Sequence, residues 1–348
     1  MSYLIQCAPG LAQIMRHELV HYGLVERKQN LFIKRQRNHD LILLNKVKNA
    51  DGFFQLRIAE AVYRAPVFGR FKISQRQLEV MAGELRELGP RRLVVQVAGR
   101  HFDRRDLERW LTKELTARGS ALDANVESEV WMMTIDELFY FAIPLAKARD
   151  ASLRNQRAQE REGSLPPTIA AALAFAGHPR PDDIIFDPVC GSGTLLAEAR
   201  AYLNEDFRGH LVGQDIDRDA ISIASENLKP VCAAESLKLE KLDSRKHAPT
   251  GCSLLIANLP FGKKFGEREA NADLYKQVIF MSLQTADSSR YRAVLLSSDV
   301  EALRSAITAV NCELAATARP ARLEWRDLFS VKIRGEKALA GLAQLRPH

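Results

Sequence analysis

Short apolar segments alternate with polar turns along residues 1–165, without a regular order of strands and helices. Period-two patterns predict strands, and apolar residues three or four positions apart predict helices. The strands are predicted over 3–7, 31–33, 41–47 and 93–97, the helices over 11–22, 74–88 and 104–118, and a hairpin over 130–133 and 138–143. This order favours one or two small α+β modules.

After Pro166 and Pro167 the pattern becomes a regular alternation of apolar strands and amphipathic helices. Strands are predicted over 184–186, 211–214, 237–242, 254–257 and 293–296, with weaker ones around Leu314 and Val331, and helices over 168–176, 194–203, 220–228, 274–285 and 301–310. Such alternation predicts a mostly parallel, doubly wound sheet, which binds ligands at the carboxyl ends of its strands.

Length and charge add to this division. A chain of 348 residues predicts about two domains. Residues 1–165 contain 27 basic and 20 acidic side chains, a net charge of +7, whereas residues 166–348 contain 23 of each. A basic excess indicates what kind of partner a protein binds and does not indicate its fold. The commonest polyanionic partner is nucleic acid. The first half is therefore a candidate for RNA or DNA binding, although a solvated basic surface has the same composition.

The cysteines and the apolar segments bear on the cellular compartment. Five scattered cysteines without a C-x-x-C pair predict no disulfide framework and no zinc site, and they fit a reducing compartment. No apolar stretch reaches about 20 residues, and the first residues lack the pattern of a signal peptide. We therefore expect a cytoplasmic protein without a membrane span, without a metal, and in monomeric form.

A glycine-containing loop follows the predicted strand over 184–186 and opens the next helix. It reads Asp-Pro-Val-Cys-Gly-Ser-Gly-Thr over 187–194. Gly191 and Gly193 allow a tight turn and close approach of a ligand to the backbone. Asp187 can accept a hydrogen bond from an ammonium group, and Asp215 ends the next strand, where ribose hydroxyls bind. A tight turn without a ligand is the alternative for each residue alone.

The loop favours S-adenosylmethionine over a dinucleotide. A dinucleotide fingerprint has a third glycine where this chain has Leu196, and the chain has no G-K-[ST] motif for phosphates. S-adenosylmethionine has no phosphate and carries an ammonium group, which suits Asp187. Asp243, after the third strand of this half, is placed to meet an adenine edge.

A second motif, Asn-Leu-Pro-Phe-Gly over 258–262, also ends an apolar strand. The side-chain oxygen of Asn258 and a backbone carbonyl can accept the two N–H groups of an exocyclic amine. The amine lone pair can then attack a methyl group in line, so that positioning provides most of the catalysis. Pro260 stiffens the loop, and Phe261 can stack on a base that has flipped out of its helix.

The segments FDPVCGSGT, GQDID and NLPFG, in this order, resemble the class I S-adenosylmethionine-dependent methyltransferases that act on exocyclic amines. Together they are similar to the THUMP-domain tRNA guanine-N2 methyltransferases. The segments YLIQCAPGLAQIMRHEL and VWMMTIDELFYFAIPL resemble the N-terminal ferredoxin-like domain and the last THUMP strands of that family. The resemblance implies a ferredoxin-like domain over 1–55, a THUMP-like RNA-binding domain over 56–147, a linker over 148–165 and a Rossmann-like methyltransferase domain with a mostly parallel seven-stranded sheet over 166–348.

The resemblance also implies roles for individual residues. The cofactor would contact Asp187, Cys190, Gly191, Gly193, Thr194, Asp215, Ile216, Asp243, Ser244 and Asn258. The guanine amine would be held by Asn258, Leu259, Pro260 and Phe261. In the basic half, the candidates for phosphate contacts are Lys34, Arg35, Arg37, Arg104, Arg105, Arg149, Arg154 and Arg157. Lys263 and Lys264, just after the target motif, are candidates for contacts with phosphates near the flipped base, and a solvated surface charge is the alternative for each of these residues. The resemblance places the RNA contact in the acceptor-stem region of tRNA. The expected product is N2-methylguanosine, for example at tRNA position 6.

Other acceptors fit the same Asn-x-Pro-aromatic loop. They are a guanine of ribosomal RNA, adenine N6 or cytosine N4 in DNA, and a protein glutamine; the basic first half argues against the last. A protein of a different class, which binds RNA on a retained methyltransferase fold without catalysis, is the remaining alternative. The intact Asn258, Leu259, Pro260 and Phe261 argue against it.

Overall fold

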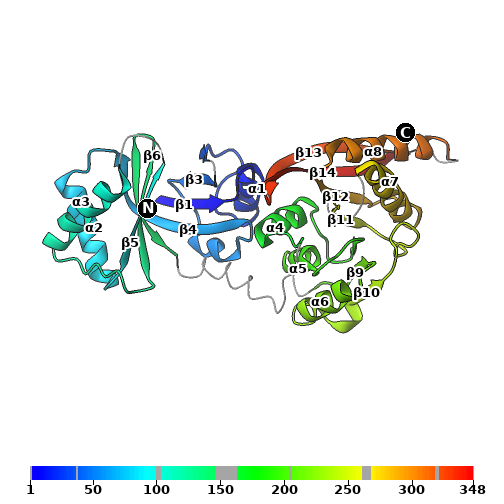
Figure 1. Cartoon of the computed structure of the whole chain (residues 1–348), viewed down its shortest axis with the longest axis horizontal. Coiled ribbons are helices and arrows are strands. Elements are labelled where there is room, and N and C mark those ends of the chain that lie inside the picture. Colours follow the sequence, from blue (N-terminus) through cyan, green and yellow to red (C-terminus); the bar gives the residue numbers. More distant parts are fainter. Residues whose placement is uncertain are drawn as a thin grey trace. The chain divides into compact units, whose positions relative to one another are not determined.

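The computed structural model describes residues 2–36, 38–98, 103–145, 163–203, 206–260, 268–317 and 321–347. The chain forms two compact units, each built around one seven-stranded sheet (Figure 1). Residues 2–7 and 19–145 belong to the first unit, and residues 8–18 and 163–347 belong to the second. The second unit therefore begins before the change of pattern at residue 165 and contains all of the regular alternation that follows it.

The first unit has the strand order β2-β3-β1-β4-β7-β6-β5. Its strands are β1 (Ser2–Cys7), β2 (Phe32–Arg35), β3 (Asp40–Leu44), β4 (Ala59–Arg70), β5 (Arg92–Ala98), β6 (Glu129–Ile135) and β7 (Leu138–Pro144). Only β5 and β6 are parallel neighbours. The other neighbours are antiparallel. The predicted hairpin is confirmed as β6 and β7, which turn at Asp136 with a φ of 52°.

Strand β4 joins the two ends of this sheet, and the sequence pattern does not predict it. Its first part pairs with β1 and its second part pairs with β7. The β7 register shifts between Arg64 and Val67, so that Pro66 lies in the irregularity. Proline has no N–H to donate to a neighbouring strand and is tolerated at such bulges. The proline and the bulge interrupt the regular alternation by which a strand is predicted from sequence.

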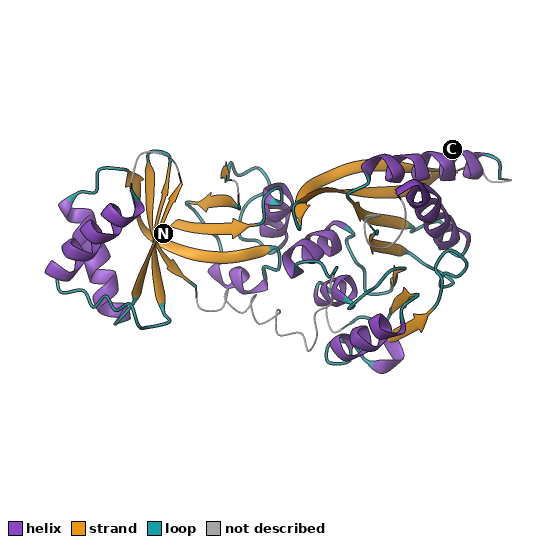
Figure 2. Ribbon diagram, viewed as in Figure 1, coloured by secondary structure: helices purple, strands orange, loops and turns teal. Residues whose placement is uncertain are grey.

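Two helices cover one face of this sheet. They are α2 (Gln75–Leu88) and α3 (Arg104–Ala117), which lie side by side in Figure 2. Their buried leucines recur at helical spacing, with Leu78 and Leu85 on α2 and Leu107 and Leu111 on α3. These side chains pack in one cluster with strand residues such as Phe141. The period of the apolar pattern therefore determines which side of each helix packs on the sheet.

The second unit has the strand order β10-β9-β8-β11-β12-β14-β13. Its strands are β8 (Ile184–Asp187), β9 (His210–Asp215), β10 (Leu237–Lys241), β11 (Leu254–Asn258), β12 (Arg292–Ser297), β13 (Ala321–Ile333) and β14 (Glu336–Pro347). The first five are parallel, and β14 is antiparallel between β12 and β13. The predicted mostly parallel seven-stranded sheet is confirmed, and its order reverses between β8 and β11, where such sheets bind ligands.

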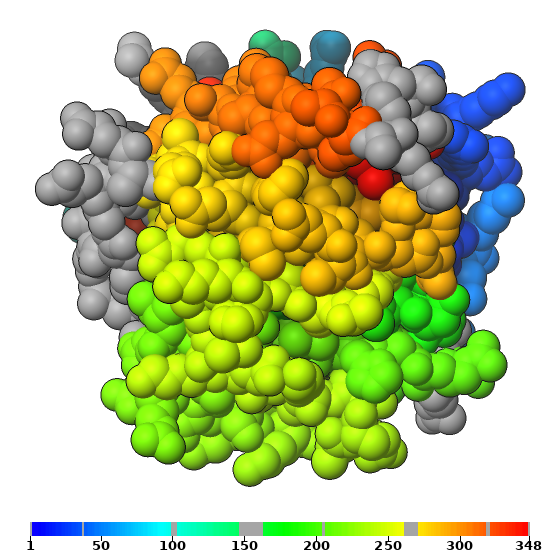
Figure 3. Space-filling view, turned by 90° about the vertical axis from the view of Figure 1, so that its right-hand side faces the viewer, coloured from blue at the N-terminus to red at the C-terminus, as the bar shows by residue number. Residues whose placement is uncertain are grey.

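The helices of the second unit are α1 (Ala12–His21, of which residues 12–18 belong to this unit), α4 (Pro167–Ala176), α5 (Thr194–Ala201), α6 (Arg218–Leu228), α7 (Arg268–Gln284) and α8 (Val300–Ala315). Short 3₁₀ turns occur at Ala50–Gln55 in the first unit and at Ala234–Ser236 in the second. Figure 3 shows α8 in orange above α7 on one face of this unit, with the yellow-green region of α6 and β10 below them. Buried Ile279 of α7 and Leu303 of α8 pack with Leu255 and Leu295 in one core cluster.

One prediction about the last strands is wrong, and one strand was not predicted. Leu314 does not begin a strand, because it lies in the last turn of α8, which extends farther than the pattern indicates. The last strand is β14, whose alanine-rich sequence Glu-Lys-Ala-Leu-Ala-Gly-Leu-Ala has little of the β-branched and aromatic composition typical of strands. It forms because it completes two ladders, one with β12 and one with β13. The strand predicted around Val331 is confirmed as β13.

Candidate active site

The two predicted motifs meet at the carboxyl edge of the second sheet. β8 ends at Asp187 and β11 ends at Asn258, and the two strands are hydrogen-bonded parallel neighbours. Because parallel strands end at the same edge, the loops that follow them open on the same side. The glycine loop and the target loop (residues 258–260 of the described chain) therefore border one site.

The two glycines of the first loop serve different needs. Gly193 has a φ of 78°, and a Cβ at this position would lie 2.9 Å from Cδ1 of Leu228 on α6. Gly191 has a φ of 52°, and a Cβ there would meet nothing within 4 Å. Gly193 thus permits packing of α5 against α6, whereas Gly191 leaves open space beside the backbone that a ligand can use.

Asp215 accepts a hydrogen bond from the glycine loop with one carboxylate oxygen and from the N-cap residue of α6 with the other. Its Oδ2 accepts the Gly191 N–H at 3.1 Å, and its Oδ1 accepts the Asp217 N–H at 3.0 Å. Each carboxylate oxygen has a second lone pair, so Asp215 can still accept ligand hydroxyls. The next residue, Ile216, leaves 72% of its surface exposed at the end of β9, where it offers an apolar surface to a flat ring.

Asp187 is a buried carboxyl group with 1% of its surface exposed. Burial raises its pKa to about 8; the Val189 N–H lowers it and the nearby charge of Asp215 raises it further. A cation brought to this carboxyl group would favour its ionised form. The carboxyl group is therefore largely protonated at neutral pH in the free protein, and an ammonium group bound where the sequence predicts one would favour its negatively charged form.

Three other predicted cofactor residues lie in the interior rather than on an open surface. Cys190, Thr194 and Ser244 each expose 5% of their surface. The Ser244 hydroxyl lies 2.7 Å from the Pro188 carbonyl oxygen and 2.9 Å from Oε1 of Gln214, so it connects the loop after β10 to the glycine loop and to β9. These residues therefore support the backbone of the glycine loop from the protein interior and expose little surface to a ligand.

Asp243 is paired with a neighbour that the sequence prediction did not include. Nε and Nη2 of Arg245 donate to its carboxylate at 2.9 and 2.8 Å. These hydrogen bonds hold the pKa of Asp243 below its usual value. The carboxylate is thus kept ionised as an acceptor for a donor such as an adenine amine.

The target loop contains a buried acceptor to which no described residue donates. Oδ1 of Asn258 is buried and accepts no hydrogen bond from any described residue. The Leu259 side chain is 1% exposed, and its N–H donates to the Leu296 carbonyl at 2.9 Å. The Pro260 carbonyl accepts from the Tyr275 hydroxyl of α7, a contact that no local pattern predicts. Phe261, Lys263 and Lys264 lie outside the described residues.

The candidates for phosphate contacts divide into three groups. Lys34 on β2 forms an ion pair with Asp136. Arg35 ends β2, and Arg104 and Arg105 occupy the first turn of α3 after the N-cap Asp103. The remaining candidates, Arg37, Arg149, Arg154 and Arg157, lie outside the described residues.

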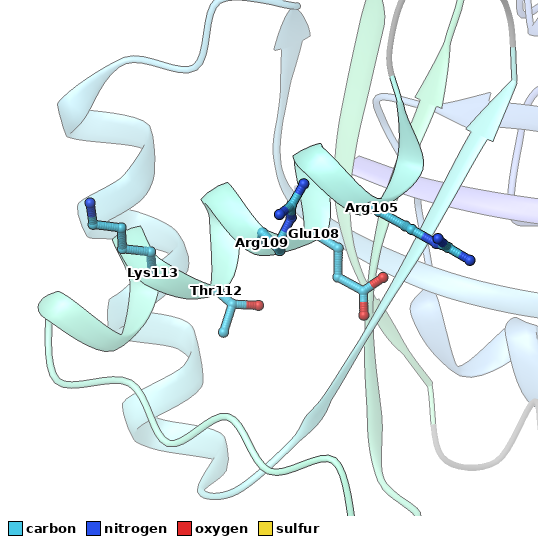
Figure 4. A pocket seen from close by; sticks show the side chains of 5 residues that line it. All are labelled: Arg105, Glu108, Arg109, Thr112 and Lys113. Carbon is cyan, nitrogen blue, oxygen red and sulfur yellow. The ribbon is translucent and has the colours of Figure 1, made fainter.

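An open hollow on α3 adds two basic residues that the sequence prediction missed. It has a volume of about 730 Å³ and is lined by Arg105, Glu108, Arg109, Thr112 and Lys113. Figure 4 shows Arg105, Arg109 and Lys113 on successive turns of α3. The signal that could have found them is their spacing of four residues after Arg105 in a predicted helix.

No three His, Cys, Asp or Glu side chains within the described ranges come together as a metal site would require. Among the helices that the structure describes, none combines the length and apolar composition of a membrane span.

Comparison with known proteins finds a similar methyltransferase domain within the second part of the chain. Residues 154–319 match the UPF0020 family of RMKL-like methyltransferase domains. The human tRNA (guanine(6)-N(2))-methyltransferase THUMP3 is 27% identical over 163 residues, which cover 42% of this chain and 32% of that protein. The mouse U6 snRNA (guanine-N(2))-methyltransferase THUMPD2 is 30% identical over 144 residues, covering 40% of this chain and 26% of that protein.

A solved structure extends the likeness to the whole chain. The crystal structure of TrmN from Thermus thermophilus has a TM-score of 0.75 and 20% sequence identity, and the match covers 99% of each chain. It shows the fold of both units. The chain spans about a third of the length of the first curated relatives it matches. The predicted resemblance to THUMP-containing guanine-N2 methyltransferases is confirmed by these matches.

Proposed function

We propose that this protein is an S-adenosylmethionine-dependent RNA methyltransferase that methylates the exocyclic N2 amine of a guanosine in tRNA. One observation supports this above the others: Oδ1 of Asn258, at the carboxyl edge of the sheet, is buried and has no partner among the described residues. A buried acceptor without a partner is costly unless a ligand supplies the donor. An exocyclic amine brings such a donor.

The residues around the glycine loop fit the cofactor. S-adenosylmethionine supplies a methyl group on a positively charged sulfur. Asp187 would hold the ammonium group, Asp215 the ribose hydroxyls and Asp243 the adenine amine, with Ile216 against the ring. The open space beside Gly191 supports this arrangement, because a side chain there would occupy the room that a bound cofactor needs.

The target loop would then orient the acceptor. The Pro260 carbonyl already accepts from Tyr275, whereas the Leu259 carbonyl accepts no hydrogen bond from the described residues. Oδ1 of Asn258 and the Leu259 carbonyl would therefore accept the two amine N–H groups. The nitrogen lone pair forms the new N–C bond as the S–C bond breaks, and the amine proton leaves to solvent.

The first unit would carry the RNA. Residues 1–165, most of which belong to this unit, contain the basic excess of the chain, and the named relatives act on tRNA and U6 snRNA. We assign residues 1–55 to a ferredoxin-like domain, 56–147 to a THUMP-like domain that grips the acceptor-stem region, 148–165 to a linker and 166–348 to the methyltransferase domain. The five cysteines are all free, which fits a reducing compartment, and we assign the enzyme to the cytoplasm and expect it to act as a monomer.

The test combines product analysis with one variant. Unmodified tRNA, ribosomal RNA and U6 snRNA are each incubated with the protein and labelled cofactor, and their nucleosides are analysed by mass spectrometry. We expect N2-methylguanosine from tRNA. Asn258→Ala should lower kcat by about 100-fold or more, because the amine loses its acceptor, while calorimetry gives cofactor affinity within about twofold of wild type. Label in a different nucleoside, or full turnover by the variant, would refute the assignment.

A further inference from the structure

We propose that Tyr275 is a positioning residue for methyl transfer, because its hydroxyl holds the Pro260 carbonyl and thereby fixes the loop that presents Asn258. This inference rests on the proposed function of the loop. Tyr275 lies on α7, so it acts through the loop and does not approach the amine as an acceptor. Its ring belongs to the buried core between α7 and the sheet.

The hydrogen bonds around Tyr275 run in one fixed direction. The Pro260 carbonyl can only accept, so Tyr275 is the donor to it. The Ser297 hydroxyl, 3.0 Å away, must then donate to the Tyr275 oxygen. Ser297 in turn accepts the Asp299 N–H at 2.9 Å. The series from Asp299 to Pro260 has no alternative orientation, and hydrogen bonds in such series polarise one another.

The far end of this series is anchored in two helices. Asp299 is the N-cap of α8, and its Oδ1 accepts the Ala302 N–H at 3.1 Å. Its Oδ2 accepts from Nδ2 of Asn271 on α7 at 3.1 Å. The Pro260 carbonyl is therefore tied to β12, α7 and α8 together, so the loop takes its position from the core of the unit.

Burial makes this anchor strong. Tyr275 and Ser297 are both fully buried, and Asn271 is 2% exposed. Burial raises the pKa of Tyr275 to about 12, so the hydroxyl stays protonated and able to donate at neutral pH. On the other side of the Leu259–Pro260 segment, the Leu259 N–H is bonded to the Leu296 carbonyl. The segment is thus held at both ends, next to Asn258.

The test compares two buried tyrosines in the same core cluster. Tyr275→Phe removes only the hydroxyl that binds Pro260. The matched control is Tyr291→Phe. Tyr291 immediately precedes the amino end of β12, is 3% exposed, and has its hydroxyl 2.7 Å from Oγ of Ser282, so it is also buried but does not contact the target loop. We expect Tyr275→Phe to lower kcat on tRNA by about 10- to 100-fold, with the KM for tRNA and the Kd for cofactor within about twofold. The control should retain wild-type kcat.

A second measurement does not require activity. Hydrogen exchange of the Leu259 amide should become about tenfold faster in Tyr275→Phe and stay unchanged in Tyr291→Phe. Unchanged exchange at Leu259, or unchanged kcat in an enzyme that Asn258→Ala inactivates, overturns the role of Tyr275. If the wild-type protein methylates no RNA, the proposed function fails instead, and amide exchange alone then decides whether Tyr275 holds the loop.

Discussion

At the scale of single residues, the carboxyl group of Asp187 couples folding to pH. Burial raises its pKa from 3.8 to about 8 in the folded chain. The folded state therefore binds this proton more tightly than the unfolded state does, and the contribution of Asp187 to stability is greatest at low pH. It falls by about 1.4 kcal/mol for each pH unit as the pH rises from about 4 to about 8.

Asp187→Asn should remove this dependence. Asparagine keeps an oxygen for the Val189 N–H but does not ionise. The variant should therefore gain stability over wild type as the pH rises, by about 1.4 kcal/mol per pH unit between pH 5 and about pH 8. Urea unfolding of both proteins without cofactor, over a pH series, measures the difference. A difference that stays constant with pH would show that Asp187 is ionised in the folded chain.

Local sequence was sufficient for some site residues and not for others. Asp187, Gly191 and Asn258 stand in short motifs at strand ends, so their neighbours along the chain reveal their place. Tyr275 is one apolar position of a helix, and its contact with Pro260 exists only after α7 packs beside the loop. Side-chain geometry likewise decides which carboxylates are paired. The hydrogen bond from Arg245 to Asp243 is an example.

At the scale of elements, the turn into α5 depends on close packing with α6. Gly193→Ala would combine a strained φ of 78° with a Cβ 2.9 Å from Leu228. We expect a loss of about 3 kcal/mol in the free energy of unfolding, from backbone strain and overpacking together. Gly191→Ala is the matched control, because its φ is also positive but its Cβ would meet open space. It should cost about 1 kcal/mol in urea unfolding, and equal losses would contradict the packing role.

Elements with regular patterns were predicted, and elements defined by their neighbours were not. The parallel strands β8, β9, β11 and β12 are short apolar segments between helices, which the pattern identifies. By contrast, β4 contains a proline in its irregular register with β7, and β14 consists largely of alanine and leucine. Their strand conformation follows from pairing on both edges, which is a long-range property that no local window contains.

At the scale of the whole molecule, charge distinguishes the parts of the chain. Residues 1–165 hold a net charge of +7, and the rest of the chain is neutral. The second unit provides a small site at a sheet edge, whose acidic residues suit a cationic cofactor. The hollow on α3 of the first unit provides Arg105 and Lys113, neither of which forms an ion pair with a described residue. The sequence total predicts a polyanionic partner, but only the fold shows which basic side chains share a surface.

If these side chains contact RNA phosphates, salt reports their number. Each contact releases counterions, so log Kd changes linearly with log salt concentration, by roughly 1 for each basic residue in contact. The double variant Arg105→Gln with Lys113→Gln should weaken binding of an unmodified tRNA by about tenfold and reduce the slope by about 2. Fluorescence anisotropy at increasing KCl concentration measures both. The control, Arg326→Gln with Lys332→Gln, removes the same two charges from exposed positions of β13 and should keep the wild-type slope. If the α3 variant keeps the wild-type slope, the phosphate contacts lie elsewhere. If both variants lose tRNA affinity equally, the loss comes from the lower net charge of the protein and not from contacts at α3.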